Sequence, residues 1–128
     1  MTNKYQKPTD AELQILQILW EHGPSSVRFV NDKLNEQREV GYTTTLKLMQ
    51  IMVEKHLAKR NTDSRTHIYE ANVSESSTQE KLLETFLDTA FRGSATKLVM
   101  QALGNHQTSS QELAAIKALI EKIEQEEK

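Results

Sequence analysis

The residues of this sequence that could carry chemistry gather in residues 42–60, which read YTTTLKLMQIMVEKHLAKR. Thr43, Lys47, Gln50 and Glu54 follow one another at helical spacing, so a helix would present them on one polar face. Threonine forms helices poorly because its branched Cβ restricts χ1, and three threonines at a helix start therefore indicate a use beyond folding. Their hydroxyls suit phosphate and their methyls suit thymine, while Lys suits guanine and Gln suits adenine. The pattern indicates recognition of duplex DNA by the first turns of a helix.

For several of these residues a plainer interpretation stays open. Thr43 or Thr44 could simply cap the helix, and Tyr42 could either support the helix start or donate its hydroxyl to a phosphate. Arg28, near the start of the preceding helix, is either a phosphate contact or a solvated side chain. The inward face of the threonine-rich helix is expected to hold Thr45 and the apolar residues that follow it at helical spacing, which are Leu48, Met49, Met52 and Val53.

The elements around this helix follow the order of a winged-helix module. Thr9 is expected to cap a first helix, with Glu12 completing a capping box, and Gly23 is expected to end it. Ser25 or Ser26 caps a second, shorter helix. After the threonine-rich helix, residues 57–60 and 65–70 predict two short strands joined by a polar turn. In a winged helix, the third helix enters the major groove and the hairpin, called the wing, lies along the phosphate backbone.

The distribution of charge agrees with this module. The net charge is −2, but residues 40–69 hold five Lys and Arg against two Asp and Glu. A local basic patch is the electrostatic footprint of nucleic-acid binding, although an ordinary solvated face explains it equally well. We predict that the wing contacts phosphates and fixes register without reading sequence. The complete set of predicted DNA-binding residues is Thr43, Thr44, Lys47, Gln50, Tyr42, Arg28, Lys59, Arg60, Arg65 and His67.

The second half of the chain predicts a helical region that a second copy completes. Capping boxes begin helices at Ser77 with Glu80 and at Ser109 with Glu112, and residues 92–94 interrupt the first of these helices. With 37% apolar and 5% aromatic residues in 128, the core is thin, which favours completion by a partner. We expect a mainly α fold with a small β-hairpin: a winged-helix DNA-binding domain over residues 1–73 and a helical dimerisation region over residues 74–128. The expected dimerisation residues are Leu82, Leu83, Phe86, Leu87, Phe91, Leu98, Val99, Leu113, Ile116, Leu119, Ile120 and Ile123.

Several classes of function are disfavoured by what the sequence lacks. It has no cysteine, so disulfides, thiolate metal sites and cysteine nucleophiles are excluded. Its four histidines are scattered, and there is neither a glycine-rich phosphate loop nor a nucleophile-elbow motif. We therefore expect no enzyme activity, no metal and no cofactor. No apolar run approaches the roughly 18 residues of a membrane span, and the polar start lacks a signal-peptide core, so a cytoplasmic protein is expected.

Taken together, the motifs PTDAELQILQILWEHGP, SSVRFVNDKL, GYTTTLKLMQIMVEKHLAKR and RTHIYEANV resemble the BlaI/MecI-type penicillinase repressors, a family that includes the copper-responsive CopY repressors. The resemblance covers nearly the whole chain. It implies a homodimer whose N-terminal winged helices bind a palindromic operator in double-stranded DNA. It also implies that the C-terminal helices intertwine and hold the two modules apart.

This sequence departs from the family pattern in three places. His56 stands where the family usually has Gly, at the end of the recognition helix, a place suited to positive φ. Gln101 and Ala102 stand where the penicillinase repressors have the Asn-Phe bond that a sensor protease is believed to cut, which leaves a protease partner in doubt. The C-terminal cysteines of CopY-type repressors are missing, so their metal mechanism is absent.

From these observations we expect a homodimeric transcriptional repressor that binds its operator through a recognition helix at residues 43–56 and a basic wing, and that an inducing signal releases. Two alternatives use the same fold without sequence-specific DNA binding. One is a protein-interaction module, which the overall acidity favours. The other is a module that senses a small ligand between the two regions. The sequence shows no cluster of aromatic or polar residues that would indicate a pocket for such a ligand.

Overall fold

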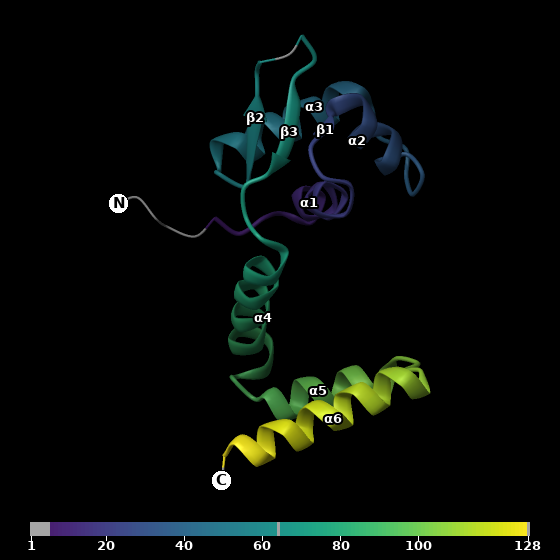
Figure 1. The fold of residues 1–128 in the computed structure, drawn as a ribbon, viewed down its shortest axis with the longest axis vertical. Coiled ribbons are helices and arrows are strands. Elements are labelled where there is room, and N and C mark those ends of the chain that lie inside the picture. The colour runs from purple at the N-terminus through teal and green to yellow at the C-terminus, as the bar shows by residue number, and fades with distance from the viewer. Residues whose placement is uncertain (1–5, 64, 128) are drawn as a thin grey trace, which may run out of the picture. The chain divides into compact units, whose positions relative to one another are not determined.

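The computed structural model describes residues 6–63 and 65–127, and in this part the chain is mainly helical with one small antiparallel sheet (Figure 1). The elements in chain order are α1 (Asp10–His22), β1 (Ser25–Ser26), α2 (Val27–Leu34), α3 (Tyr42–Glu54), β2 (Ala58–Asn61), β3 (Ile68–Ala71), α4 (Glu75–Phe91), α5 (Ala95–Asn105) and α6 (Ser110–Glu126). The chain divides into two compact units, Met1–Leu83 and Glu84–Lys128, and the division falls inside α4. The expected fold class is confirmed, while the domain boundary at residue 73 stays a prediction.

The first two helices begin at the capping residues that the sequence indicates. Thr9 and Glu12 form the expected capping box on α1, with the Glu12 carboxylate accepting from the Thr9 N–H at 2.9 Å. Of the two serines considered for α2, Ser26 is the cap, because its hydroxyl accepts from the Phe29 N–H at 3.1 Å. These caps satisfy N–H groups that a helix start leaves without partners.

The third helix begins differently. Its N-cap is Gly41, which has no side chain to offer, so neither Thr43 nor Thr44 caps this helix and that alternative is wrong. The helix runs over Tyr42–Glu54, one residue earlier at its start and two residues earlier at its end than the expected 43–56. The hydroxyls of Thr43 and Thr44 are therefore not needed for its start.

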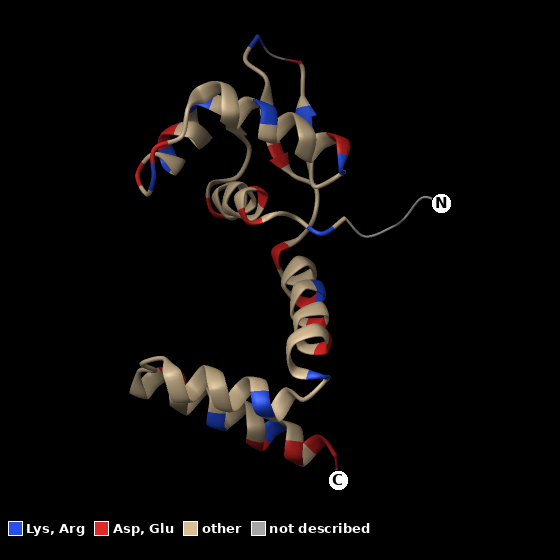
Figure 2. Cartoon of the chain, turned by 180° about the vertical axis from the view of Figure 1, so that it is seen from behind, with Lys and Arg blue, Asp and Glu red and all other residues tan. Residues whose placement is uncertain are grey.

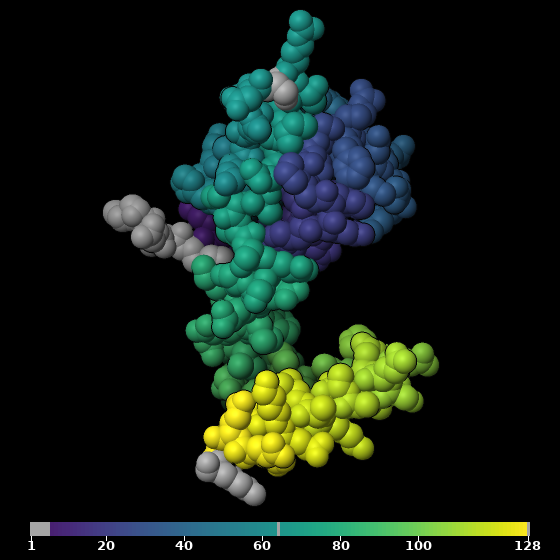
Figure 3. Space-filling view, viewed as in Figure 1, coloured from purple at the N-terminus to yellow at the C-terminus, as the bar shows by residue number. Residues whose placement is uncertain are grey.

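A third strand, which the sequence did not indicate, completes the wing. β1 pairs antiparallel with β3, and the strand order is β1-β3-β2. Tyr69, in the central strand, lies opposite Ser25 on one side and Arg60 on the other. Two residues are too few to show the alternation by which a strand is identified from sequence. In Figure 3 a narrow column of teal atoms projects beyond the ends of β2 and β3.

The core of the first unit lies between α1, α2, α3 and the sheet. Its buried apolar residues are Ile15, Leu16, Leu19, Val27, Val30, Leu34, Val40, Met49, Met52, Leu57, Ala58 and Tyr69. Thr45, Met49 and Met52 form the buried face of α3, with Leu48 and Val53 packed partly buried beside them, so the predicted inward stripe is confirmed. The Trp20 ring N–H donates to the Val73 carbonyl at 2.9 Å and ties α1 to the segment that follows the wing. This packing fixes which side of α3 faces outward.

The end of α3 contains a left-handed residue that is not glycine. His56 has a φ of 65°, so the positive φ expected from its place in the family pattern is confirmed. Its N–H donates to the Val53 carbonyl at 3.0 Å, and the Leu57 N–H donates to the Met52 carbonyl at 2.9 Å. These two bonds are the pair that defines a Schellman helix end. Asn72 supports the turn by donating its side-chain amide to the His56 carbonyl at 3.1 Å.

Replacing His56 with Gly is expected to raise the free energy of unfolding by about 0.5–1 kcal/mol. A Cβ in the left-handed region costs about 1–2 kcal/mol, and the greater freedom of glycine in the unfolded chain offsets part of the gain. Urea unfolding of His56→Gly beside the original chain measures the difference. A variant of equal or lower stability would show that the His56 side chain contributes contacts that outweigh its backbone strain.

In the second unit α5 and α6 run antiparallel (Figure 1). Arg92 and Gly93 have φ values of 53° and 80°, and Ser94 caps α5, so the expected interruption at residues 92–94 is confirmed. Ser109 and Glu112 form the expected capping box on α6.

The capping box expected from Ser77 and Glu80 is wrong. α4 begins at Glu75, and Ser77 lies inside its first turn. The Ser74 hydroxyl accepts from the Ser77 N–H at 3.1 Å, so an earlier serine does the capping. Both serines fit the sequence rule, and the chain uses the one that lies nearer to the wing.

Candidate nucleic-acid interface

The outward face of α3 carries the four polar residues that the sequence singles out. Thr43, Lys47, Gln50 and Glu54 are all exposed, whereas Thr45 on the other side of the helix is 0% exposed. At about 100° of rotation per residue, the four lie within a sector of about 60°. The predicted polar face is therefore present, and its contact with DNA stays a prediction. Thr44 is exposed as well but lies about 60° further round the helix than Lys47.

A hollow of about 530 Å³ lies beside this face, between α2, α3 and the wing. Eleven residues line it, and six of these are predicted DNA-binding residues. The six are Arg28, Tyr42, Gln50, Arg60, Arg65 and His67. The guanidinium carbon of Arg28 lies 5.5 Å from the centre of the Tyr42 ring, within the range of a cation–π contact. The Tyr42 ring therefore favours a position of the Arg28 guanidinium along the hollow that both residues line. Three arginines around one hollow form a surface suited to phosphate.

Lys59 lies apart from this group. In the register of the wing, Lys59 is opposite Glu70, and the next pair is Arg60 with Tyr69. Because neighbouring residues of a strand point to opposite faces, Lys59 and Arg60 lie on different sides of the hairpin. Arg60 lines the hollow and Lys59 does not. Figure 2 shows Lys and Arg on the wing strands and acidic residues at the C-terminal end of α6.

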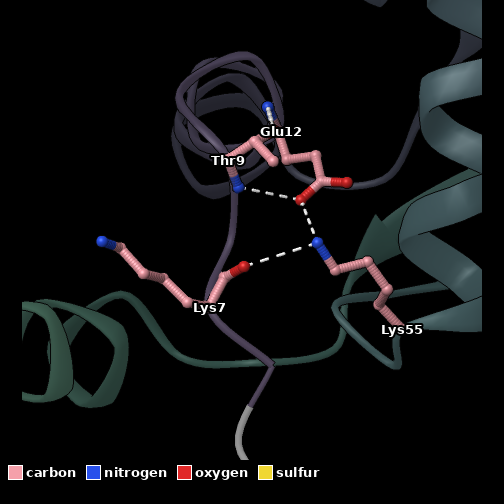
Figure 4. Close-up of polar contacts among 4 residues, drawn as sticks. All are labelled: Lys7, Thr9, Glu12 and Lys55. Carbon is pink, nitrogen blue, oxygen red and sulfur yellow. Dashed lines mark hydrogen bonds and ion pairs between the residues drawn. The ribbon is translucent and has the colours of Figure 1, made fainter.

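Sequence reasoning missed an ion pair that ties the start of α1 to the end of α3. The Glu12 carboxylate, 3% exposed, accepts from the Lys55 ammonium at 2.7 Å (Figure 4). The same ammonium lies 3.4 Å from the Lys7 carbonyl, to which it also donates. Lys55 counted toward the basic patch in the sequence, but its charge is matched by Glu12. No sequence pattern links two residues 43 positions apart.

Sequence reasoning also missed a hydrogen-bonded link between α2 and α3. Asn31, 9% exposed, donates its side-chain amide to the Thr45 hydroxyl at 2.8 Å. Thr45 was expected to be in the core, and it is, but its hydroxyl has a partner there. Buried polar groups are normally paired in this way.

Residues 6–63 and 65–127 contain neither a candidate metal site nor a candidate membrane-spanning helix. No group of three or more His, Cys, Asp or Glu side chains in this range could hold a metal ion. No helix in this range is long and apolar enough to cross a bilayer.

Comparison with known sequences gives matches that run across both units. The family described as penicillinase repressor matches residues 8–122. The penicillinase repressor of Staphylococcus aureus is 23% identical over 123 residues, which cover 96% of this chain and 98% of that protein. The penicillinase repressor of Bacillus licheniformis is 23% identical over 113 residues, 88% of each chain. The transcriptional regulator BlaI of Mycobacterium tuberculosis is 33% identical over 61 residues, 47% of this chain and 44% of the regulator.

Comparison with solved structures identifies the fold. The DNA-binding domain of the repressor BlaI has a TM-score of 0.51 and 22% identity, and covers 57% of this chain and 89% of that domain. MarR from E. coli has a TM-score of 0.51 at 14% identity, and covers 91% of this chain and 77% of its own. A mutant of the same MarR, complexed with operator DNA, also has a TM-score of 0.51. The likeness confirms the winged-helix fold.

Proposed function

The chain belongs to the penicillinase repressor family, and from that premise we propose that it acts as a homodimer on a palindromic operator. Membership of this family makes it a DNA-binding transcriptional repressor and not an enzyme. The observation that carries the proposal is the outward face of α3, where Thr43, Lys47 and Gln50 lie exposed beside a hollow lined with arginines.

In the proposed complex, the first turns of α3 enter the major groove. Lys47 and Gln50 reach base edges, where Lys suits guanine and Gln suits adenine. Thr43 and Thr44 bind phosphate next to the N-terminus of α3, whose unpaired N–H groups and partial positive charge favour anions. The basic residues of the hollow bind the backbone and fix the register. Sequence preference and affinity thus come from different residues.

The proposed dimer follows from apolar side chains that the single chain leaves in solvent. None of the twelve expected dimerisation residues is buried, and Leu119, Ile120 and Ile123 on α6 are 55%, 51% and 46% exposed. A monomer rarely exposes so many apolar side chains on neighbouring helices, so a second copy is the natural cover. A two-fold axis would place the two α3 helices in successive major grooves, about 34–36 Å apart. Bound there, the dimer blocks a promoter by occupying it.

Release by an inducing signal is part of the same proposal. Gln101 and Ala102 are exposed but lie within α5. A sensor protease acting between them would first have to unwind this helix, since proteolysis prefers exposed loops. Because a repressor acts where the DNA is, the proposal includes the cytoplasmic location expected from the sequence.

Selection from a random pool of DNA duplexes tests the proposal. We expect the full chain to enrich a palindrome whose half-sites lie about 10 base pairs apart, and its affinity to fall steeply as salt rises. Enrichment of nothing, at low as well as moderate salt, would favour the protein-interaction alternative. An enriched site without two-fold symmetry would contradict the dimer while leaving DNA binding in place.

A Lys47→Ala variant is expected to lose discrimination at one position of each half-site. A good side-chain contact to a base contributes about 1–3 kcal/mol, so the loss should be about five-fold to a hundred-fold per half-site. Fluorescence anisotropy with duplexes changed at one position at a time measures it. Arg60→Ala, at the hollow, is the contrasting variant and should weaken binding to every duplex about equally while lowering the salt dependence. An equal loss of affinity on every duplex would show that Lys47 contacts phosphate instead.

A further inference from the structure

Two asparagines at the end of α2 hold the segment that leads into α3. Asn31 donates its side-chain amide to the Thr45 hydroxyl at 2.8 Å and to the Val40 carbonyl at 3.0 Å. The Thr45 hydroxyl in turn donates to the Gly41 carbonyl at 3.3 Å. Because Thr45 is 0% exposed and Asn31 is 9% exposed, neither side chain is available to DNA.

Asn35, one turn further along, bonds to Val40 as well. Its side-chain amide donates to the Val40 carbonyl at 2.8 Å and to the Asn31 carbonyl at 2.7 Å. Its side-chain oxygen accepts from the Val40 N–H at 3.1 Å. Both polar groups of Val40 are therefore bonded to asparagine side chains. We call Asn31, Asn35 and Thr45 the asparagine clamp.

The position of the clamp explains why hydrogen bonds, and not apolar contacts alone, hold the segment before α3. Gly41, the next residue, is the N-cap of α3 and has no side chain that could fix the helix start. The connection before it, residues 36–39, is exposed and polar. Apolar packing alone is non-directional, whereas a satisfied network of hydrogen bonds specifies one arrangement. The clamp supplies the directional contact that the cap does not.

We propose that the asparagine clamp sets the sequence discrimination of the repressor by fixing how far the tip of α3 projects toward DNA. The inference rests on the proposed function, since it assigns positioning residues to the helix that reads the operator. A recognition constellation has to be held within about 0.5 Å of its productive geometry. Thr43 and Lys47 lie within one turn of the clamped segment, so a small shift of the helix start moves both. Phosphate contacts through flexible Lys and Arg side chains tolerate such a shift far better than bidentate contacts to bases.

Thr45→Val and Thr45→Ser form the matched pair that tests the clamp. Valine has nearly the shape of threonine but removes the hydroxyl, which leaves the Asn31 amide one acceptor short. Serine keeps the hydroxyl and removes a methyl group. Each variant is titrated with the duplex selected by the original chain and with a scrambled duplex of equal length. The measurements are made at one salt concentration and well below the melting temperature of each protein, so that only folded molecules are compared.

For Thr45→Val we expect the ratio of the two dissociation constants to fall about ten-fold, which corresponds to about 1.4 kcal/mol. Its affinity for the scrambled duplex should stay within about two-fold, because that binding is electrostatic. Thr45→Ser should keep a ratio close to that of the original chain. A Thr45→Val variant with a lower melting temperature but the same discrimination between duplexes as the original chain would overturn the proposal. The hydrogen-bond network would then contribute to stability alone. Equal losses in both variants would overturn the proposal as well, since the hydroxyl would not be the cause.

The wild-type measurement separates this inference from the proposed function. If the original chain prefers no duplex over the scrambled one, the proposed operator binding fails, and the clamp fails with it. If the original chain discriminates and Thr45→Val does so equally, the clamp alone is overturned.

Discussion

A Lys55→Ala variant should have a free energy of unfolding about 3 kcal/mol below that of the original chain. Removing one partner of a buried ion pair costs about 3–5 kcal/mol, because the remaining charge is left without compensation. The lower end applies here, since the Thr9 N–H still donates to the Glu12 carboxylate and the Lys55 side chain is 22% exposed. For a unit of this size the loss lowers the melting temperature by more than about 10 °C.

Urea unfolding with Lys59→Ala as the control measures this effect. Lys59 is exposed, so its removal should change stability by less than about 0.5 kcal/mol. A second variant, Glu12→Gln with Lys55→Met, removes both charges and should recover much of the loss, since neutral replacement of a buried pair is often tolerated. If Lys55→Ala proves as stable as Lys59→Ala, then the Glu12 carboxylate is not buried as described and the tie between α1 and α3 is absent.

An Ile120→Glu variant is expected to abolish the dimer. Ile120 is 51% exposed in the single chain, so a charged side chain there leaves the monomer folded. In a dimer it occurs twice, and about half of the roughly 1.5–3 kcal/mol for burying a whole isoleucine remains to be gained at each copy. The two copies together lose about 1.5–3 kcal/mol of apolar burial, and each buried carboxylate without a partner adds about 3–5 kcal/mol, so association weakens at least a hundred-fold.

Sedimentation equilibrium over a range of concentrations detects this change. Gln111→Glu adds the same charge on the opposite side of α6 and should leave the dimer intact, provided that the apolar stripe is the interface. An original chain that sediments as a monomer, or an Ile120→Glu variant that associates as well as Gln111→Glu, would contradict the proposed dimer. Either result would require another source for the two-fold symmetry of the operator.

Local patterns predicted much of the fold. The capping box of Thr9 and Glu12 marked the start of α1, and the spacing of Thr45, Met49 and Met52 told the buried side of α3 from the polar side. The positive φ of His56 followed from its place in the family pattern. Each of these inferences depends on residues within a few turns of one another, where periodicity and capping rules apply.

Features that depend on distant residues could not be predicted. β1 is a strand because Ser25 meets Tyr69, not because of its own two residues. The register of β2 with β3 sets the face of the hairpin on which Lys59 lies. A shift of one residue would have placed Lys59 on the face that Arg60 now occupies. The clamp joins Asn31 to Thr45 and the ion pair joins Glu12 to Lys55, and neither has a signature in the sequence. At the candidate site, therefore, the residue types and the shared polar face of α3 were predictable, while the grouping of Arg28, Arg60 and Arg65 around one hollow was not.

The most direct test is to map where α3 lies on the operator. The chain has no cysteine, so Glu54→Cys provides a single attachment point for an iron chelate that cleaves nearby DNA. Glu54 lies on the same exposed face as Lys47 but further along the helix, where the reagent leaves the first turns free. We predict cleavage of the selected duplex at two places about 10 base pairs apart. The same reagent on Gln17→Cys, an exposed residue of α1, should leave the duplex intact; intact DNA with Glu54→Cys, or equal cleavage from both positions, would contradict the reading of DNA by α3.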